Sequence, residues 1–187
     1  MTYFNTRDIA GIAICAALWG VLNSIFSPIF FRMFGLPFLC DLIGFSVLTV
    51  AAVWIKKFGA VTMVGLVATV INFMFNPGGL QFLGFTVASI AFDLLVKVVG
   101  YHNLFKKQVY VVAIMMSISI FSAALAGYII GTFFMAGPAL AMWGGVLGWA
   151  GLHAVGGVIG GALGVVLVVA LISRKVIVPT NQQALKA

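Results

Sequence analysis

The chain has 187 residues, of which 64% are hydrophobic and only 7% are charged. Soluble domains carry charge on roughly a quarter of their residues, so this composition excludes an ordinary soluble domain and indicates an integral membrane protein. The formal net charge of +7 does not indicate a nucleic-acid partner, because the basic residues stand singly or in pairs between long apolar runs, as signals of membrane topology do.

Six apolar segments approach the roughly 20 residues that a membrane-spanning helix needs. In chain order they cover residues 9–27, 37–55, 59–75, 79–99, 109–135 and 145–172. The first run follows Arg7 and Asp8 and is long enough to span, so we expect a permanent helix rather than a cleaved signal peptide. The connections are short, and residues 1–187 are therefore predicted to form one domain, an all-α membrane protein built as a compact bundle of six transmembrane helices.

The basic residues predict the orientation of this bundle. With the N-terminus in the cytoplasm, the outer side carries only Arg32, and all the other basic residues lie on the inner side. These inner residues are Arg7, Lys56, Lys57, Lys97, Lys106, Lys107, Arg174, Lys175 and Lys186. Because positive charge concentrates on the cytoplasmic side of membrane proteins, both termini are predicted to be cytoplasmic.

The three outer connections, "SPIFFRMFGLPF", "FNPGGLQF" and "MAGPALAMWGG", share prolines, glycines and aromatic residues, and they carry almost no charge. Turns of this composition suit a lid over a pocket that opens outward. Tight turns capped by aromatic residues at the membrane interface would have the same composition, so both interpretations stay open.

The motifs of common enzyme classes are missing from this sequence. It contains no GxxxxGK[ST] phosphate-binding loop and no HExxH zinc motif. His102 and His153 cannot make a closed zinc site without unusual partners, and Cys15 and Cys40 are expected to be free, packed thiols at opposite depths of the membrane. We therefore expect a protein that is not an enzyme, with no catalytic residues, no cofactor and no metal.

Two of the three acidic residues fall within the predicted helices. Asp93 precedes Lys97 by four residues, a spacing that predicts a local salt bridge on one helix face. Asp41 stands near the outer end of the second segment, where it could cap the helix, pair with Arg32 or contact a ligand. These alternatives stay open for Asp41.

Several polar and aromatic residues from different segments share the outer depth of the membrane. They are Asn72, Asn76, Gln81, Thr86, Tyr128, Thr132, Trp143, Trp149 and His153. A small pocket with aromatic walls and a few hydrogen-bonding groups suits a flat heterocycle. His153 shares a helix face with Gly156 and Gly160, so it is predicted to point into a helix contact, and a buried histidine paired with a carbonyl group is the alternative. The glycines of this face are expected to pack the last helix within its own bundle.

The stretch "TRDIAGIAICAALWG" places Ala10, Ala13, Ala17 and Gly20 on one stripe of a helix. Ala13 and Ala17 match the AxxxA motif of the substrate-binding S components of energy-coupling factor (ECF) vitamin transporters, and the chain resembles that family over nearly its whole length. The resemblance implies a prokaryotic plasma-membrane protein. It also implies that the motif faces a shared transmembrane coupling subunit, which two cytoplasmic ATPases drive.

The same resemblance implies a binding site for a vitamin-like small molecule in the outer half. The residues that it points to are Arg32, Asn76, Gln81, Phe85, Tyr128, Trp149 and His153, with Arg32 and Asn76 in loops. The "NPGG" loop followed by "QFLGFTVASIAFD" is similar to S components for thiamine or its hydroxymethylpyrimidine precursor. The absence of any glutamate disfavours a cationic thiamine ligand, and Thr2 replaces the histidine of nickel and cobalt S components, so no metal substrate is implied. A structural subunit of a membrane complex and a solitary small-molecule carrier remain alternatives.

Overall fold

A computed structural model describes residues 3–101 and 108–177, and these residues form helices and no strands. In chain order the helices are α1 (Thr6–Phe34), α2 (Phe38–Ile55), α3 (Ala60–Phe75), α4 (Phe82–Val99), α5 (Gln108–Phe133), α6 (Gly137–Ala141) and α7 (Gly145–Ser173). All six expected segments are helical, and the short α6 lies within the last outer connection. By length and composition, α1, α2, α4, α5 and α7 could each cross a membrane, whereas α3 is apolar but has only 16 residues.

The first helix is longer than the sequence pattern predicted. Asn5 and Asp8 form a capping box at its start, where the Asn5 side chain accepts a hydrogen bond from the Asp8 N–H and the Asp8 carboxylate accepts one from the Asn5 N–H. The helix then continues through Pro28 and ends at Gly35, which has φ 70° in the left-handed conformation that favours glycine. A proline often ends a helix, but membrane helices tolerate one because neighbouring groups satisfy the freed carbonyl.

This extension corrects the expected first outer connection. Arg32 was expected in a loop, and it lies instead in the last turn of α1. Asn76, the other residue expected in a loop, is the C-cap residue of α3, and its N–H donates to the Asn72 carbonyl at 2.7 Å. Both side chains are therefore held by the ends of helices.

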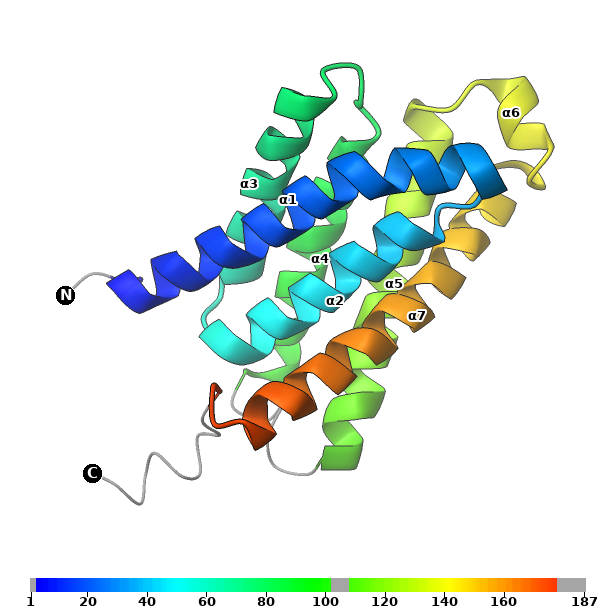
Figure 1. Cartoon of the computed structure of the whole chain (residues 1–187). Coiled ribbons are helices and arrows are strands. Elements are labelled where there is room, and N and C mark those ends of the chain that lie inside the picture. Colours follow the sequence, from blue (N-terminus) through cyan, green and yellow to red (C-terminus); the bar gives the residue numbers. More distant parts are fainter. Residues whose placement is uncertain (1–2, 102–107, 178–187) are drawn as a thin grey trace, which may run out of the picture.

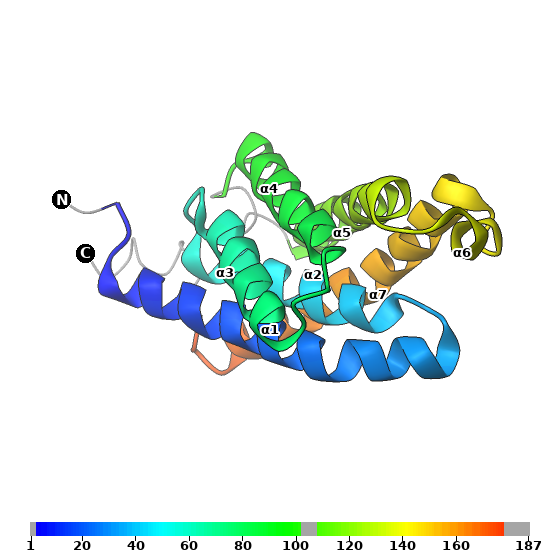
Figure 2. The ribbon, with the colours of Figure 1, turned by 90° about the horizontal axis from the view of Figure 1, so that it is seen from above.

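The helices form a closed ring in which α2 is a member and also contacts the helices on the opposite side. In this ring α1 packs against α3, α3 against α4, α4 against α5, α5 against α7, and α7 against α2, which in turn contacts α1. Because α2 also contacts α3, α4 and α5, it occupies the middle of the bundle. Seen from above, α1 forms one long outer edge of the molecule (Figure 2).

Glycines allow α7 to approach two helices at once. A Cβ added at Gly160 would lie 2.5 Å from the backbone oxygen of Asp41 on α2, and one added at Gly157 would lie 2.8 Å from that of Ser119 on α5. Real Cβ atoms do not come so close to backbone atoms, so these positions require glycine. The glycine face of α7 therefore packs inside the bundle, as the spacing predicted.

The start of α1 and the end of α7 lie at the same end of the bundle (Figure 1). At this end Lys57 forms an ion pair with Asp8, with 2.6 Å between Nζ and Oδ2, and donates to the Tyr3 carbonyl at 2.9 Å. Lys106, Lys107, Lys186 and His102 were also expected on this side, and they lie outside the described residues.

Asp93 is buried in a hydrogen-bond cluster that holds α4 to α3. Its Oδ2 accepts from the N–H of Gly59 at 2.9 Å and from the N–H and hydroxyl of Thr62 at 3.0 and 2.8 Å. The Tyr101 hydroxyl donates to Oδ1, and burial together with this neighbouring carboxylate raises the pKa of Tyr101 well above its usual range. The expected salt bridge to Lys97 is therefore wrong.

The physical reason lies at the start of α3, whose first N–H groups have no partner within their own helix. Asp93 accepts from two of the N–H groups at this helix end, those of Gly59 and Thr62, because α4 brings its carboxylate against it. Lys97 lies instead over the ring of Phe58, with 4.1 Å from Nζ to the ring centroid.

Candidate functional site

A cavity of about 310 Å³ lies at the end of the bundle opposite the start of α1. The ends of six helices (α1, α2, α3, α4, α5 and α7) and the α1–α2 connection contribute to its wall. Its aromatic lining consists of Phe31, Phe82, Phe85, Phe134 and Trp149, and its polar lining of Ser27, Arg32, Asn76, Gln81 and His153. The remaining lining residues are Pro28, Leu36, Pro37, Cys40, Ile130 and Met135.

The structure brings six of the seven residues expected to bind substrate to this one cavity. They are Arg32, Asn76, Gln81, Phe85, Trp149 and His153. Tyr128 does not line it, because its side chain is 48% exposed on the outer face of α5. Ile130, two residues further along the same helix, turns inward and lines the cavity in its place.

Sequence reasoning missed the residues that the end of α1 contributes. Ser27, Pro28 and Phe31 line the cavity because α1 continues past residue 27, where the first segment was expected to end. Ser27 and Phe31 are four residues apart, a spacing that places two side chains on one helix face. That spacing was the available signal, but it has meaning only once the segment is known to be helical.

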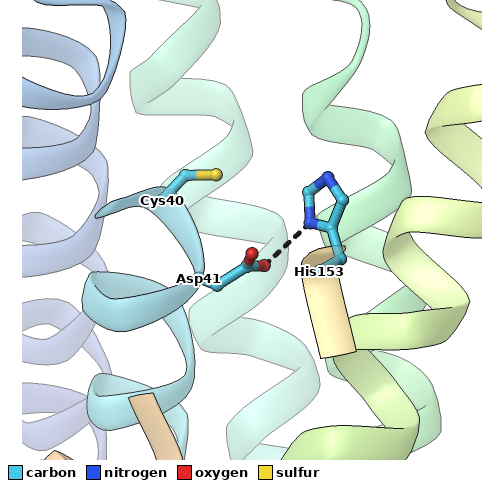
Figure 3. A group of neighbouring side chains, drawn as sticks. All are labelled: Cys40, Asp41 and His153. Atoms are coloured by element: carbon cyan, nitrogen blue, oxygen red, sulfur yellow. Dashed lines mark hydrogen bonds and ion pairs between the residues drawn. The ribbon is translucent and has the colours of Figure 1, made fainter. Parts of the chain in front are cut away.

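One cavity residue, His153, belongs to a pair of ionisable residues. His153 on α7 and Asp41 on α2 are joined by a hydrogen bond of 2.9 Å between Nδ1 and Oδ1 (Figure 3). The two side chains are 1% and 0% exposed. Asp41 therefore pairs with His153 and not with Arg32, and His153 pairs with a carboxylate where a carbonyl was the expected alternative.

Packing fixes the position of the His153 ring. It makes an edge contact with Trp149, at 5.2 Å between ring centroids, and a tilted contact with Phe85 at 5.8 Å. A Cβ added at Gly127 on α5 would lie 2.7 Å from its Cδ2 atom. Four helices therefore hold the imidazole: α2 through Asp41, α4 through Phe85, α5 through Gly127 and its own α7.

Three polar atoms in this region have no hydrogen-bond partner among the described residues: Nε2 of His153, Oδ2 of Asp41 and Nε1 of Trp149. Buried polar groups are nearly always paired. Because Asp41 engages Nδ1 of His153, the remaining ring nitrogen is the one that can form a hydrogen bond with a small molecule in the cavity.

The charge of the lining is unbalanced. Among the described lining residues Arg32 is the one with a permanent charge, and none is a carboxylate. Asp41 lies behind the wall, with its carboxylate held by His153. The cavity is therefore better suited to a neutral or anionic ligand than to a cation.

Cys40 stands beside this pair on α2. Its thiol donates to the Pro37 carbonyl at 2.7 Å, and its Sγ, a carboxylate oxygen of Asp41 and a ring nitrogen of His153 all lie within 4.8 Å of one another. Figure 3 shows the thiol and the Asp41 carboxylate on the same side of α2, facing His153. The other thiol, Cys15, is buried in α1, and both cysteines are free, as expected.

Asn72, expected among the outer polar residues, belongs to a separate cluster between α1 and α3. Its Oδ1 accepts from the Ser24 hydroxyl at 2.7 Å and from Asn23 Nδ2 at 3.3 Å, and its own Nδ2 donates to the Ala68 carbonyl at 2.9 Å. Ser27, which lines the cavity, donates to Asn23 Oδ1 at 2.7 Å. This cluster anchors the part of α1 that approaches the cavity.

The small-residue stripe of α1 divides between two faces. Ala10, Ala13 and Ala17 are exposed on the outside of the bundle. Gly20 is buried, and a Cβ added there would lie 2.7 Å from the Cβ of Ile71 on α3. The expected single stripe is therefore wrong at Gly20, which packs within the bundle, while Ala13 and Ala17 are available to a partner or to lipid.

Comparison of this chain with protein-family models, with curated proteins and with solved structures found no match.

Proposed function

We propose that this chain is the substrate-binding S component of an ECF-type importer. It captures a small vitamin or vitamin precursor from outside a prokaryotic cell and delivers it inward with a transmembrane coupling subunit and two cytoplasmic ATPases. The substrate class is a flat, uncharged heterocycle, of which the hydroxymethylpyrimidine precursor of thiamine is the first candidate. The protein binds this molecule and performs no chemistry on it.

The observation that carries the proposal is the cavity at one end of an apolar helical bundle. Its volume of about 310 Å³ is at the small end of the roughly 300–1,000 Å³ that ligand sites occupy. Phe85 and Trp149 provide aromatic surface for a flat ring, and the amides of Asn76 and Gln81 provide donors and acceptors at its edge. This combination suits a pyrimidine with a hydroxyl and an amino group.

The charge of the cavity supports the neutral precursor over thiamine itself. Thiamine carries a permanent positive charge on its thiazolium ring, and a buried cation needs a compensating group. Arg32 lines the cavity, and no carboxylate does so among the described residues. A neutral ligand avoids this mismatch.

The exposed face of α1 supports assembly with a coupling subunit. Helices in lipid associate through close packing rather than through hydrophobic transfer, and small residues permit that packing. Ala13 and Ala17 are four residues apart and both exposed. A smooth surface of this kind also suits a contact that forms and dissociates reversibly.

The test of the binding function begins with mass spectrometry of small molecules released from the purified full-length protein. Calorimetry with hydroxymethylpyrimidine and with thiamine follows, and we expect measurable binding of the first and much weaker binding of the second. If no molecule is released and neither compound binds, the chain is better explained as a structural subunit of a membrane complex.

The test of assembly is co-purification with a coupling subunit and its ATPases. Ala13→Leu and Ala17→Leu should each reduce co-purification and leave ligand binding unchanged. Ala162→Leu is the matched control, because Ala162 is an exposed alanine on α7. Equal co-purification of all three variants would place the docking face elsewhere, and ligand uptake in cells that lack the coupling subunit and ATPases would indicate a solitary carrier.

A further inference from the structure

We propose that Cys40, Asp41 and His153 bind a divalent transition-metal ion, of which Zn²⁺ is the most suitable, at the inner wall of the cavity. The three donors are the Cys40 sulfur, one carboxylate oxygen of Asp41 and one ring nitrogen of His153. They come from two helices and lie within 4.8 Å of one another. The expectation of no metal rested on the N-terminus of the chain and on its two histidines, and this cluster supplies a mixed set of ligands at a different place.

The donor set defines the class of metal. Thiolate and imidazole ligands favour zinc and its neighbours in the first transition series, whereas calcium and magnesium require oxygen ligands. A thiolate, a carboxylate and a neutral imidazole together carry two negative charges, which a divalent ion neutralises. Binding releases the proton of the Cys40 thiol, and the resulting complex has no net charge in a site where uncompensated charge is costly.

Metal binding requires small movements of the three donor atoms. With metal–ligand distances of roughly 2.0–2.3 Å, two ligand atoms of a tetrahedral site lie about 3.3–3.8 Å apart. The three donor atoms lie within 4.8 Å of one another, and Nδ1 and Oδ1 are 2.9 Å apart, so side-chain movements of about one ångström bring them to these distances. The Cys40 side chain can rotate, because it is only partly buried. Its thiol is engaged only by the hydrogen bond to the carbonyl of Pro37, just before α2 begins.

The surroundings leave the donors ready for this role. Oδ2 of Asp41 is buried and has no partner among the described residues, so the carboxylate has an oxygen available to an ion. The metal takes the place of the hydrogen bond between Asp41 Oδ1 and His153 Nδ1, two atoms that already lie 2.9 Å apart. A hydrogen-bonded pair alone leaves the buried Oδ2 of Asp41 without a partner among the described residues.

Three protein ligands leave the fourth position of a tetrahedral ion open. Cys40 and His153 both line the cavity, so this position faces it. A ring nitrogen or a hydroxyl of a bound heterocycle can complete the coordination there. This last step rests on the proposed function, whereas binding of the metal by the three side chains does not.

The experiment uses tag-free, full-length protein in detergent, treated with chelator and then titrated with Co²⁺ alone. We expect one Co²⁺ per chain, a thiolate-to-cobalt charge-transfer band in the near ultraviolet and the strong visible bands of tetrahedral cobalt. Addition of Zn²⁺ should remove these bands by displacement. The chain has only two cysteines, which makes the origin of the charge-transfer band easy to assign.

Cys40→Ser should abolish the charge-transfer band and weaken Co²⁺ binding at least tenfold, and His153→Gln should weaken it similarly. Cys15→Ser is the matched control and should bind as the parent does. The proposal is overturned if the folded parent gives no charge-transfer band, if the band survives in Cys40→Ser, or if it disappears in Cys15→Ser. Thermal unfolding of each variant separates loss of the site from loss of the fold.

A parallel titration with hydroxymethylpyrimidine separates this proposal from the proposed function. If chelated protein binds the heterocycle and never binds Co²⁺, the metal proposal fails and the S-component proposal stands. If Co²⁺ binds with its charge-transfer band and no heterocycle binds, the metal site stands without that function.

Discussion

Asp41 and His153 are 112 positions apart in the chain, and their side chains meet at 2.9 Å in the interior of the bundle. The contact joins the central helix α2 to α7 and lies directly behind the cavity wall, which His153 itself lines. A pair in this position links the stability of the bundle to the shape of the site, because neither side chain can move without disturbing both helices.

Removing one member of this pair should destabilise the protein strongly. Asp41→Leu or His153→Leu leaves the partner buried without its hydrogen bond, and an unsatisfied buried polar group costs about 1–3 kcal/mol, more when it is charged. The double variant removes both polar groups, so it should lose less than the sum of the two single variants. Denaturant unfolding in detergent measures this double-mutant cycle, and losses that add to within about 0.5 kcal/mol would show that the two residues are not coupled.

The approach of α7 to α2 gives a second prediction. In Gly156→Ala, the new methyl carbon would lie 2.6 Å from the Cβ of Asp41, so the two helices must separate or Asp41 must turn away from His153. We expect a loss of roughly 1–3 kcal/mol, as for other overpacked cores. Gly151→Ala on the same helix is the control, because a Cβ there meets nothing within 4 Å. Similar melting temperatures for the two variants would contradict this account of the α2–α7 contact.

The sequence was a good guide to features that depend on local periodicity. Apolar runs located all six long segments, because a helix in lipid needs an unbroken apolar stretch. Four-residue glycine spacing correctly placed the α7 face inside the bundle. Residues near the expected outer ends of the segments, such as Gln81 and Trp149, also came together at one cavity.

Features that depend on three-dimensional packing were harder to predict. Tyr128 shares its depth with cavity residues, but its rotation about α5 directs it outward, and depth alone does not reveal rotation. Asp93 accepts hydrogen bonds from backbone N–H groups at the start of α3 and does not pair with the nearby Lys97. The reason is that the start of a helix has N–H groups that need acceptors. The pairing of Asp41 with His153 required the packing of α2 on α7, which no local pattern contains.

Variants of the cavity lining should separate binding from folding. Trp149→Ala removes a large aromatic wall, and Gln81→Ala removes a hydrogen-bonding group at the start of α4, so each should weaken binding of the co-purified ligand about tenfold or more, or roughly 1.4 kcal/mol. Gln81 is exposed, so its variant should keep the parent's melting temperature. Tyr128→Ala, outside the cavity, is the control and should bind normally. Unchanged affinity in both lining variants would mean that the ligand binds elsewhere.

The orientation of the bundle is open to a labelling test in intact cells. Gly78 and Gly137 lie in the two connections beside the cavity end, and a Cβ at either position meets nothing within 4 Å, so cysteines are accommodated there. Ser173 is an exposed residue at the end of α7, at the opposite end of the bundle. Because basic residues concentrate on the cytoplasmic side, an impermeant thiol reagent should label Gly78→Cys and Gly137→Cys in intact cells, and Ser173→Cys only after the membrane is opened.

The parent protein, which has Cys15 and Cys40, gives the background level of labelling in this measurement. Cys15 is buried and Cys40 is partly buried, so access of the reagent to them is restricted. The argument for the orientation depends on the contrast between the two ends: Arg7, Lys57 and Arg174 lie at one end, and Arg32 lies at the other, beside the cavity. Labelling of Ser173→Cys in intact cells, with Gly78→Cys protected, would invert the bundle. The cavity would then open to the cytoplasm, and capture of a substrate from outside by this site would be ruled out.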